Sequence, residues 1–400
     1  MKNSFITRQA IYDKNLSVYA YQLLSHNNAS VDEQNTNIET TNVILNALND
    51  IGMPSLIGKH PAFINFAYDL LIDKKTLPSL SSQVVINISG NIQITEELIS
   101  IVKKHAGNGN MIALSNVIDL EKFSPLVEIA DVIKIDILQF DKNTLSDQVK
   151  KLQQYDVRLL AENIGTLEEH ELCDELGFDY FHGSFLCLPS PTENQRAPAN
   201  KLTIINLLDQ LQDPNVQIEK LEELISQDLA LSYRLLKYIN SAAFSMQREV
   251  DSIHHAIVML GLNTIRSLAN LMLMSKFDNK PHDLLVIAIV RARMCEELAS
   301  HLAPKVKDTF FTIGLFSVID ALMDDSIENI ISPLPLSTMI KDALLKHEGL
   351  AGEALKCCIA FERADWENVY IENIDEMTIQ NAYFNALIWS KEATFLIEEE

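Results

Sequence analysis

Polar side chains stand at or near the ends of a series of apolar, strand-like runs in the first half of the chain. They are Gln22, Asn65, Asn87, Ser115, Asn116, Lys134, Asp136, Glu162 and His182. Carboxylates, a lysine and a histidine in such positions are groups that could move a proton or hold a metal ion. Neutral amides and a hydroxyl predominate here, so the set is polar but poor in the negative charge that divalent cations prefer.

The strand-like runs alternate with helical patterns. The runs are 18–24, 62–67, 83–89, 111–116, 131–138, 157–164 and 179–185, and helical stretches lie between them at 38–50, 95–107 and 166–177. The last stretch opens on Thr166, a typical N-cap, and closes on Gly177, a typical residue just past a helix end.

This alternation predicts a parallel sheet, because parallel strands need crossover connections that are usually helices. The number of units in so short a segment favours a small, TIM-like (β/α) barrel, with an open, doubly wound sheet as the alternative. In such a barrel the functional side chains lie at the C-terminal strand ends. The polar residues fall at these ends.

The pattern changes after a proline-bearing segment. Residues 191–200 are expected to be a linker between a barrel domain at 1–190 and a helical domain at 201–400. Beyond the linker, single apolar stripes at helical spacing occupy 229–240 and 378–389. The expected fold class is therefore α/β plus all-α.

Charge and cysteine content exclude several functions. A net charge of −23 argues against nucleic-acid binding, which needs a basic face. The longest aliphatic run, 284–290, is too short to cross a bilayer, and the first residues lack the apolar region of a secretory signal. Five scattered cysteines indicate reduced thiols in a cytoplasm.

Longer motifs carry a family resemblance. "RQAIYDKNLSVYAYQLLSH" (8–26) and "AENIGTLEEHELCDELGFDYFHGSFLCLP" (161–189) resemble the EAL domain, a bacterial cyclic di-GMP phosphodiesterase built as a (β/α) barrel. "SQDLALSYRLLKYINSAAF" (226–244), "SIHHAIVMLGLNTIRSLANLMLM" (252–274) and "GLFSVIDALM" (314–323) look like an HDOD domain. Together they resemble the YuxH-like EAL-plus-HDOD signalling proteins over nearly the whole chain.

The resemblance implies roles for the strand-end residues. Asn65, Lys134 and Glu162 match a metal-binding asparagine, a lysine and a glutamate of active EAL domains. At the other positions the family's carboxylates, arginine or glutamine are replaced, by Gln22, His26, Asn87, Ser115, Asn116 and His182. One surviving glutamate cannot neutralise the two divalent cations that the family's hydrolysis needs, so neither metal nor other cofactor is expected.

Structural roles are the alternative for the same residues. Gln22 is then a hydrogen-bonded barrel residue, Asn65 and Asn87 satisfy loop amides, and His182 is a satisfied interior histidine. Lys134 and Glu162 are expected to form a structural ion pair. In the helical half, the dipeptide His282–Asp283 follows a proline, and its aspartate is interpreted as a first-turn acid rather than a metal ligand.

The expected function is that of a non-catalytic bacterial signalling regulator, not an enzyme, linked to cyclic di-GMP-controlled motility or biofilm traits. The expected partner is a protein of the same pathway, contacted through the HDOD domain, with no role for nucleic acid or membrane. A homodimer is left open. A metal-independent cyclic di-GMP sensor is the first alternative, and an active phosphodiesterase is the second.

Overall fold

The structure is a computed structural model. It describes residues 4–27, 41, 44, 52–72, 81–117, 120–189, 207–208, 210–211, 217–226, 229–240, 250, 252–274, 280–334 and 336–394. The chain divides into two compact units, Met1–Leu186 with Phe361–Trp366 and Cys187–Ala360 with Glu367–Glu400. The domain limits expected at 190 and 201 stay a prediction, and the expected linker 191–200 lies outside the described residues.

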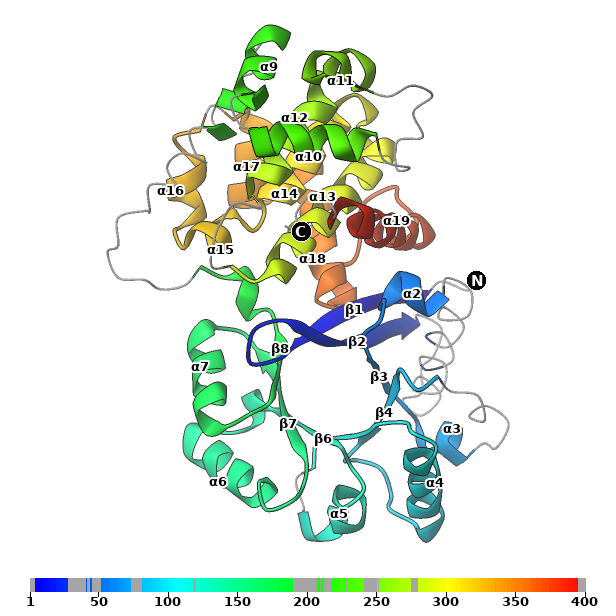
Figure 1. Ribbon diagram of the computed structural model, residues 1–400. Coiled ribbons are helices and arrows are strands. Elements are labelled where there is room, and N and C mark those ends of the chain that lie inside the picture. Colours follow the sequence, from blue (N-terminus) through cyan, green and yellow to red (C-terminus); the bar gives the residue numbers. More distant parts are fainter. Residues whose placement is uncertain are drawn as a thin grey trace. The chain divides into compact units, whose positions relative to one another are not determined.

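The first unit contains a closed, eight-stranded barrel with its strands in sequential order (Figure 1). The TIM-like barrel predicted from the alternation of strands and helices is confirmed. Neighbouring strands from β2 to β8 pair in parallel. The strands are β1 (Ser4–Tyr12), β2 (Val18–Asn27), β3 (Ala62–Asn65), β4 (Val84–Ser89), β5 (Ile112–Ser115), β6 (Val132–Asp136), β7 (Arg158–Ile164) and β8 (Tyr180–Gly183).

Strand β1 was missed in the sequence and corrects the expectation of a wholly parallel sheet. It pairs antiparallel with both β2 and β8 and so closes the barrel. A tight turn joins β1 to β2, where the Asp13 carboxylate accepts hydrogen bonds from the backbone N–H groups of Asn15 and Ser17 at 2.8 and 3.0 Å. Such a turn joins two antiparallel strands without a crossover helix. The alternation of strand-like and helical patterns in the sequence therefore gave no sign of β1.

Helices cover the outside of the barrel (Figure 1). Helix α7 (Leu167–Leu176) begins with the predicted capping arrangement. Thr166 Oγ1 accepts from the N–H of Glu169, and the Glu169 carboxylate accepts from the N–H of Thr166. Gly177 follows with a φ of 90°, as a left-handed helix end requires. The other helices are α2 (Met53–Leu56), α3 (Tyr68–Ile72), α4 (Glu96–Gly107), α5 (Leu120–Val127) and α6 (Lys142–Leu152); most of the helix expected at 38–50 lies outside the described residues.

The regular elements among the described residues of the second unit are all helices, as predicted. Its long central helix α13 (His282–Leu302) packs against α14 (Lys307–Phe316) and α19 (Glu376–Thr394). None of the described helices combines the length and apolar character needed to cross a membrane. The other helices are α9 (Ile218–Ser226), α10 (Leu229–Ile239), α11 (Ile253–Leu260), α12 (Leu262–Met274), α15 (Ile319–Met323), α16 (Ile327–Ile331), α17 (Thr338–Lys346) and α18 (Gly349–Glu362).

Gly314 lets α13 and α14 approach closely. A Cβ atom at this position would lie 2.5 Å from the backbone of Ala292 and of Arg291. We therefore expect Gly314→Ala to separate the two helices and to cost about 1–3 kcal/mol, the usual effect of overpacking. The thermal unfolding midpoint should fall by several degrees. The matched control is Gly107→Ala at the end of α4, where a Cβ meets nothing within 4 Å; an equal fall in both variants would contradict this assignment.

His182 lies on β8 where the barrel closes on β1. Its Nε2 donates to Gln9 Oε1 on the neighbouring strand β1 at 3.0 Å. Burial, more than the nearby charges, lowers the pKa of this imidazole to about 4. The folded barrel therefore holds a neutral histidine, whereas the unfolded chain takes up a proton near pH 6.5.

We expect this histidine to make the barrel less stable in acid. Its stabilising contribution is complete above the unfolded pKa and is lost as the pH falls from 6.5 to 4, by about 2 kcal/mol at pH 5. His182→Gln removes the titration, so the fall in unfolding midpoint between pH 7 and pH 5 should shrink by roughly 4–8 °C. The exposed His254 provides the control His254→Gln. A fall unchanged in His182→Gln would show that other groups govern the acid sensitivity.

Candidate functional site

A polar layer lies directly above the apolar layer that fills the barrel. Each strand from β1 to β7 contributes one fully buried residue to the apolar layer. These residues are Ile11, Ala20, Phe63, Val85, Ala113, Val132 and Leu160. Two residues further toward the C-terminal end of β2 to β7 stand Gln22, Asn65, Asn87, Ser115, Lys134 and Glu162. Because side chains alternate along a strand, residues two apart point the same way. The strand alternation thus brings most of the sequence-predicted residues together.

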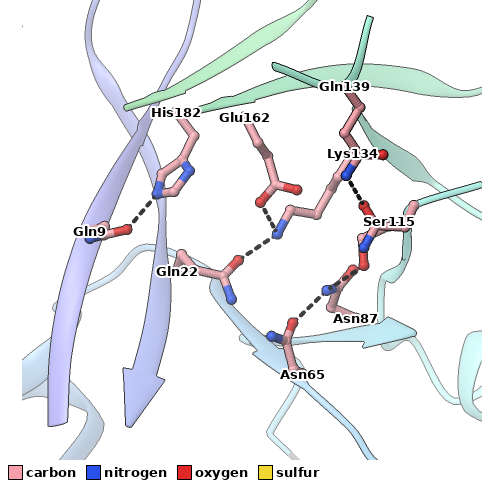
Figure 2. A network of polar contacts seen from close by, with 10 residues as sticks. Gln9, Gln22, Asn65, Asn87, Ser115, Lys134, Gln139, Glu162 and His182 are labelled. Carbon is pink, nitrogen blue, oxygen red and sulfur yellow. Dashed lines mark hydrogen bonds and ion pairs between the residues drawn. The ribbon is translucent and has the colours of Figure 1, made fainter. Parts of the chain in front are cut away.

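Lys134 occupies the centre of this polar layer (Figure 2). Its Nζ lies 2.6 Å from Glu162 Oε1 and donates to Gln22 Oε1 at 2.7 Å. The lysine and the glutamine are 3% and 2% exposed. The predicted ion pair between Lys134 and Glu162 is confirmed. It is charge-balanced, and a buried pair of this kind persists only when hydrogen bonds complete it, as the Gln22 carbonyl does here.

The amides of β3 and β4 form a second arm of the layer. Asn87 Nδ2 donates to Asn65 Oδ1 at 2.5 Å and to Ser115 Oγ at 3.3 Å. The expectation of a loop partner is therefore wrong for the NH₂ group of Asn87, and for Asn65 it stays a prediction. Parallel pairing sets Asn65 opposite Asn87 in the ladder, so the two amides reach each other before they reach a loop.

Two atoms of the layer are left without a partner. Among the described residues, no group hydrogen-bonds Gln22 Nε2 or Asn87 Oδ1, although both atoms are buried. An unsatisfied buried donor or acceptor costs roughly 1–3 kcal/mol. An orphan donor and an orphan acceptor in one layer therefore mark a place for a ligand or ordered water that offers both functions.

Gln9 belongs to the same layer and was missed in the sequence. It stands two residues before Ile11 on the antiparallel β1, opposite Gln22, and bonds His182. The expectation that His182 is fully satisfied is only half right, because its buried Nδ1 has no partner among the described residues. Strand direction could have identified Gln9. On a parallel strand the polar residue follows the buried apolar residue by two positions, so on the antiparallel β1 it precedes Ile11 by two.

Asn116 and His26 are not drawn into the layer. Asn116 follows β5 with a left-handed φ of 57° and accepts a hydrogen bond from Gln139 Nε2 at 3.4 Å. His26 lies four residues beyond Gln22 on β2, where its ring stacks on Trp366 of the same unit. Asp136, the second strand-end carboxylate, caps the following turn by accepting from Leu138 N.

The donors do not fit the pair of divalent cations that the resemblance implies. Glu162 is the one carboxylate in the polar layer, and it already neutralises Lys134. The remaining oxygens belong to neutral amides and a hydroxyl, which add no charge to compensate two ions. Within the described residues, no three His, Cys, Asp or Glu side chains gather into a metal site.

The helical unit shows no second candidate centre at its His–Asp dipeptide. His282 is the first residue of α13, and Asp283 lies in the first turn behind Pro281. The interpretation of Asp283 as a first-turn acid is confirmed. Ser317, which directly follows α14, accepts a hydrogen bond from Arg291 Nη1 at 3.2 Å.

Comparisons with known proteins found a family model, curated relatives and solved structures that resemble this chain. A family model described as HDOD domain matches residues 198–326. Cyclic di-GMP phosphodiesterase CdgJ from Vibrio cholerae is 29% identical over 411 residues, which cover 99% of this chain and 94% of CdgJ. Uncharacterized protein YuxH from Bacillus subtilis is 29% identical over 96% of this chain and 97% of its own length. The Bacillus subtilis YkuI protein, a solved structure with an EAL domain, is 18% identical over 64% of this chain and 73% of its own, with a TM-score of 0.38.

The likeness to CdgJ corrects the expectation that this chain is not an enzyme. A relative that aligns along nearly the whole chain is named a phosphodiesterase. The expectation rested on the side chains at a few strand ends. Amide and hydroxyl oxygens are themselves ligands for hard cations, so their presence does not decide whether hydrolysis takes place.

The barrel and the helical unit thus account for both parts of the resemblance. The closed (β/α) barrel places the polar residues at its C-terminal strand ends. The HDOD match begins after the barrel and ends within the described helices of the second unit. The alignments with CdgJ and YuxH cover 99% and 96% of this chain, so they extend over both parts. The chain is therefore similar to YuxH over nearly its whole length, and it combines a closed (β/α) barrel with a helical unit in which an HDOD match begins at residue 198.

Proposed function

We propose that this chain is a regulator in cyclic di-GMP signalling. Its barrel takes up cyclic di-GMP at the polar layer, and its HDOD domain passes the resulting state to a protein partner in the control of motility or biofilm traits. The observation that carries the proposal is the polar layer at the strand ends, with its buried orphan donor and acceptor. The likeness to a protein named a cyclic di-GMP phosphodiesterase supports the choice of ligand.

Charge and cysteines support the rest of the proposal. A chain with a net charge of −23 repels nucleic-acid polymers, so a protein is the partner of choice. None of Cys173, Cys187, Cys295, Cys357 and Cys358 forms a disulfide. Scattered thiols favour a cytoplasmic location, where cyclic di-GMP signalling is expected to operate.

Hydrolysis of cyclic di-GMP is the second candidate function, favoured by the name of CdgJ. It would share the polar layer with the binding function, since Lys134 and Glu162 are the charged residues there. Binding and hydrolysis are separated by incubating the full-length protein with cyclic di-GMP and either Mg²⁺ or Mn²⁺. Chromatographic detection of the linear dinucleotide, at a rate proportional to protein, would establish the enzyme.

We expect Lys134→Met to weaken cyclic di-GMP binding at least tenfold, or about 1.4 kcal/mol, because it removes the cation of the layer. Calorimetric titration of the full chain measures the change. Lys150→Met, which removes an exposed lysine on α6, is the control with the same loss of charge. Thermal unfolding checks that each variant is folded. Equal affinities in Lys134→Met and wild type would place the ligand elsewhere.

The HDOD domain carries a candidate contact surface on α11. Val258 and Met259 are 64% and 56% exposed there. Exposed apolar side chains favour protein contacts, so Val258→Lys with Met259→Lys should reduce partner capture by full-length bait at least threefold, without changing cyclic di-GMP binding. Ile388→Lys on α19, where the side chain is 46% exposed, is the control. Quantitative mass spectrometry of captured proteins gives the ratio; loss only in the control would move the contact surface to α19.

A further inference from the structure

The cation at the centre of the polar layer is supplied by the chain itself. Lys134 Nζ lies between the oxygens of Gln22 and Glu162, at 2.7 and 2.6 Å. The resemblance implies a carboxylate at both of these positions in active EAL domains, and here one of the two is an amide. We propose that the layer recognises the phosphodiester of cyclic di-GMP directly, through the N–H groups of Lys134 and Gln22, with no divalent cation between protein and phosphate. The inference rests on the proposed function and specifies how its ligand is held.

A count of hydrogen-bond donors supports direct recognition. A lysine ammonium carries three protons, and the described residues give that of Lys134 two hydrogen-bond acceptors, Gln22 Oε1 and Glu162 Oε1. No described residue offers the third proton a hydrogen-bond acceptor; the Phe63 ring, with its centroid 5.9 Å from Nζ, is a weaker neighbour that a phosphate oxygen can outcompete. Gln22 adds a buried carboxamide NH₂ with no partner among the described residues. Two neighbouring N–H donors, one of them charged, suit an anionic phosphate oxygen.

A metal bridge would conflict with the same contacts. The Gln22 carbonyl and the Glu162 carboxylate both point at the ammonium, so a divalent cation would have to displace it or lie beside it. Two like charges a few ångströms apart repel strongly in a site shielded from water. Gln22 also brings no negative charge to offset a metal. The amide that weakens a metal site therefore adds a donor for phosphate.

The orphan acceptor suggests the second contact with the ligand. Asn87 Oδ1 is buried without a partner, on β4, and its NH₂ is already used by Asn65 and Ser115. A ribonucleotide carries a hydroxyl group close to its phosphate. The phosphate would accept from the N–H donors on β2 and β6, and the hydroxyl would donate to the oxygen on β4. The ligand class is therefore a ribose phosphodiester, with Asn87 accepting from the 2′-hydroxyl.

Gln22→Glu separates direct recognition from metal-bridged recognition because the two predict opposite effects. If the phosphate is held directly, the new carboxylate repels it and removes a donor, so calorimetric affinity for cyclic di-GMP in EDTA should fall at least tenfold. If a metal is the bridge, the carboxylate restores a ligand and affinity in Mg²⁺ should rise. Gln154→Glu, at an exposed position after α6, is the control for added charge. Gln22→Met, which removes the donor without adding charge, should also weaken binding in EDTA.

The full-length wild-type protein provides the remaining comparison. We expect equal affinity in EDTA and in Mg²⁺, within about twofold, and at least threefold weaker binding of the 2′-deoxy analogue. Binding in Mg²⁺ that vanishes in EDTA would overturn direct recognition while leaving the proposed uptake of cyclic di-GMP intact. Equal binding of the deoxy analogue would overturn the role of Asn87. Absence of binding under both conditions would defeat the proposed function and this inference with it.

Discussion

Side chains alternate in direction along each strand, and the pairing register holds the strands in place. Together these two constraints determine which residues form the barrel core and which form the polar site. One set of inward residues closes the barrel with apolar side chains, and the residues two positions on form the polar layer above them. Polar groups in such a ring cannot turn back into the core without losing their hydrogen bonds. They satisfy one another or a ligand, as the bonds from Lys134 to Gln22 and from Asn87 to Asn65 show.

Much of this arrangement could be predicted from the sequence because it depends on local signals. Apolar runs gave β2 to β8 to within a few residues, and Thr166 and Gly177 correctly marked the limits of α7. The antiparallel β1 could not be found in the same way, because its pairing with β8 joins residues far apart in the chain. The partners of Asn87 likewise depend on register between strands, which local patterns do not determine.

The expectation of lost activity failed for a different reason. It treated a few side chains as decisive, whereas the likeness to CdgJ extends over 99% of the chain. Side-chain chemistry at a site limits what the site can hold. It does not by itself state which reaction the protein performs. The ion pair between Lys134 and Glu162, also expected from the sequence, is present in the structure because it required only that two neighbouring strands carry opposite charges.

Lys134 is tethered to β6, so its positive charge is present once in every folded barrel. A dissociable ion, in contrast, fills its site according to its concentration and affinity, and a chelator can withdraw it. Phosphate held by the tethered charge would respond to the supply of nucleotide alone. On the proposed mode of binding, such a barrel would keep the same sensitivity to cyclic di-GMP while magnesium and manganese levels in the cell rise and fall.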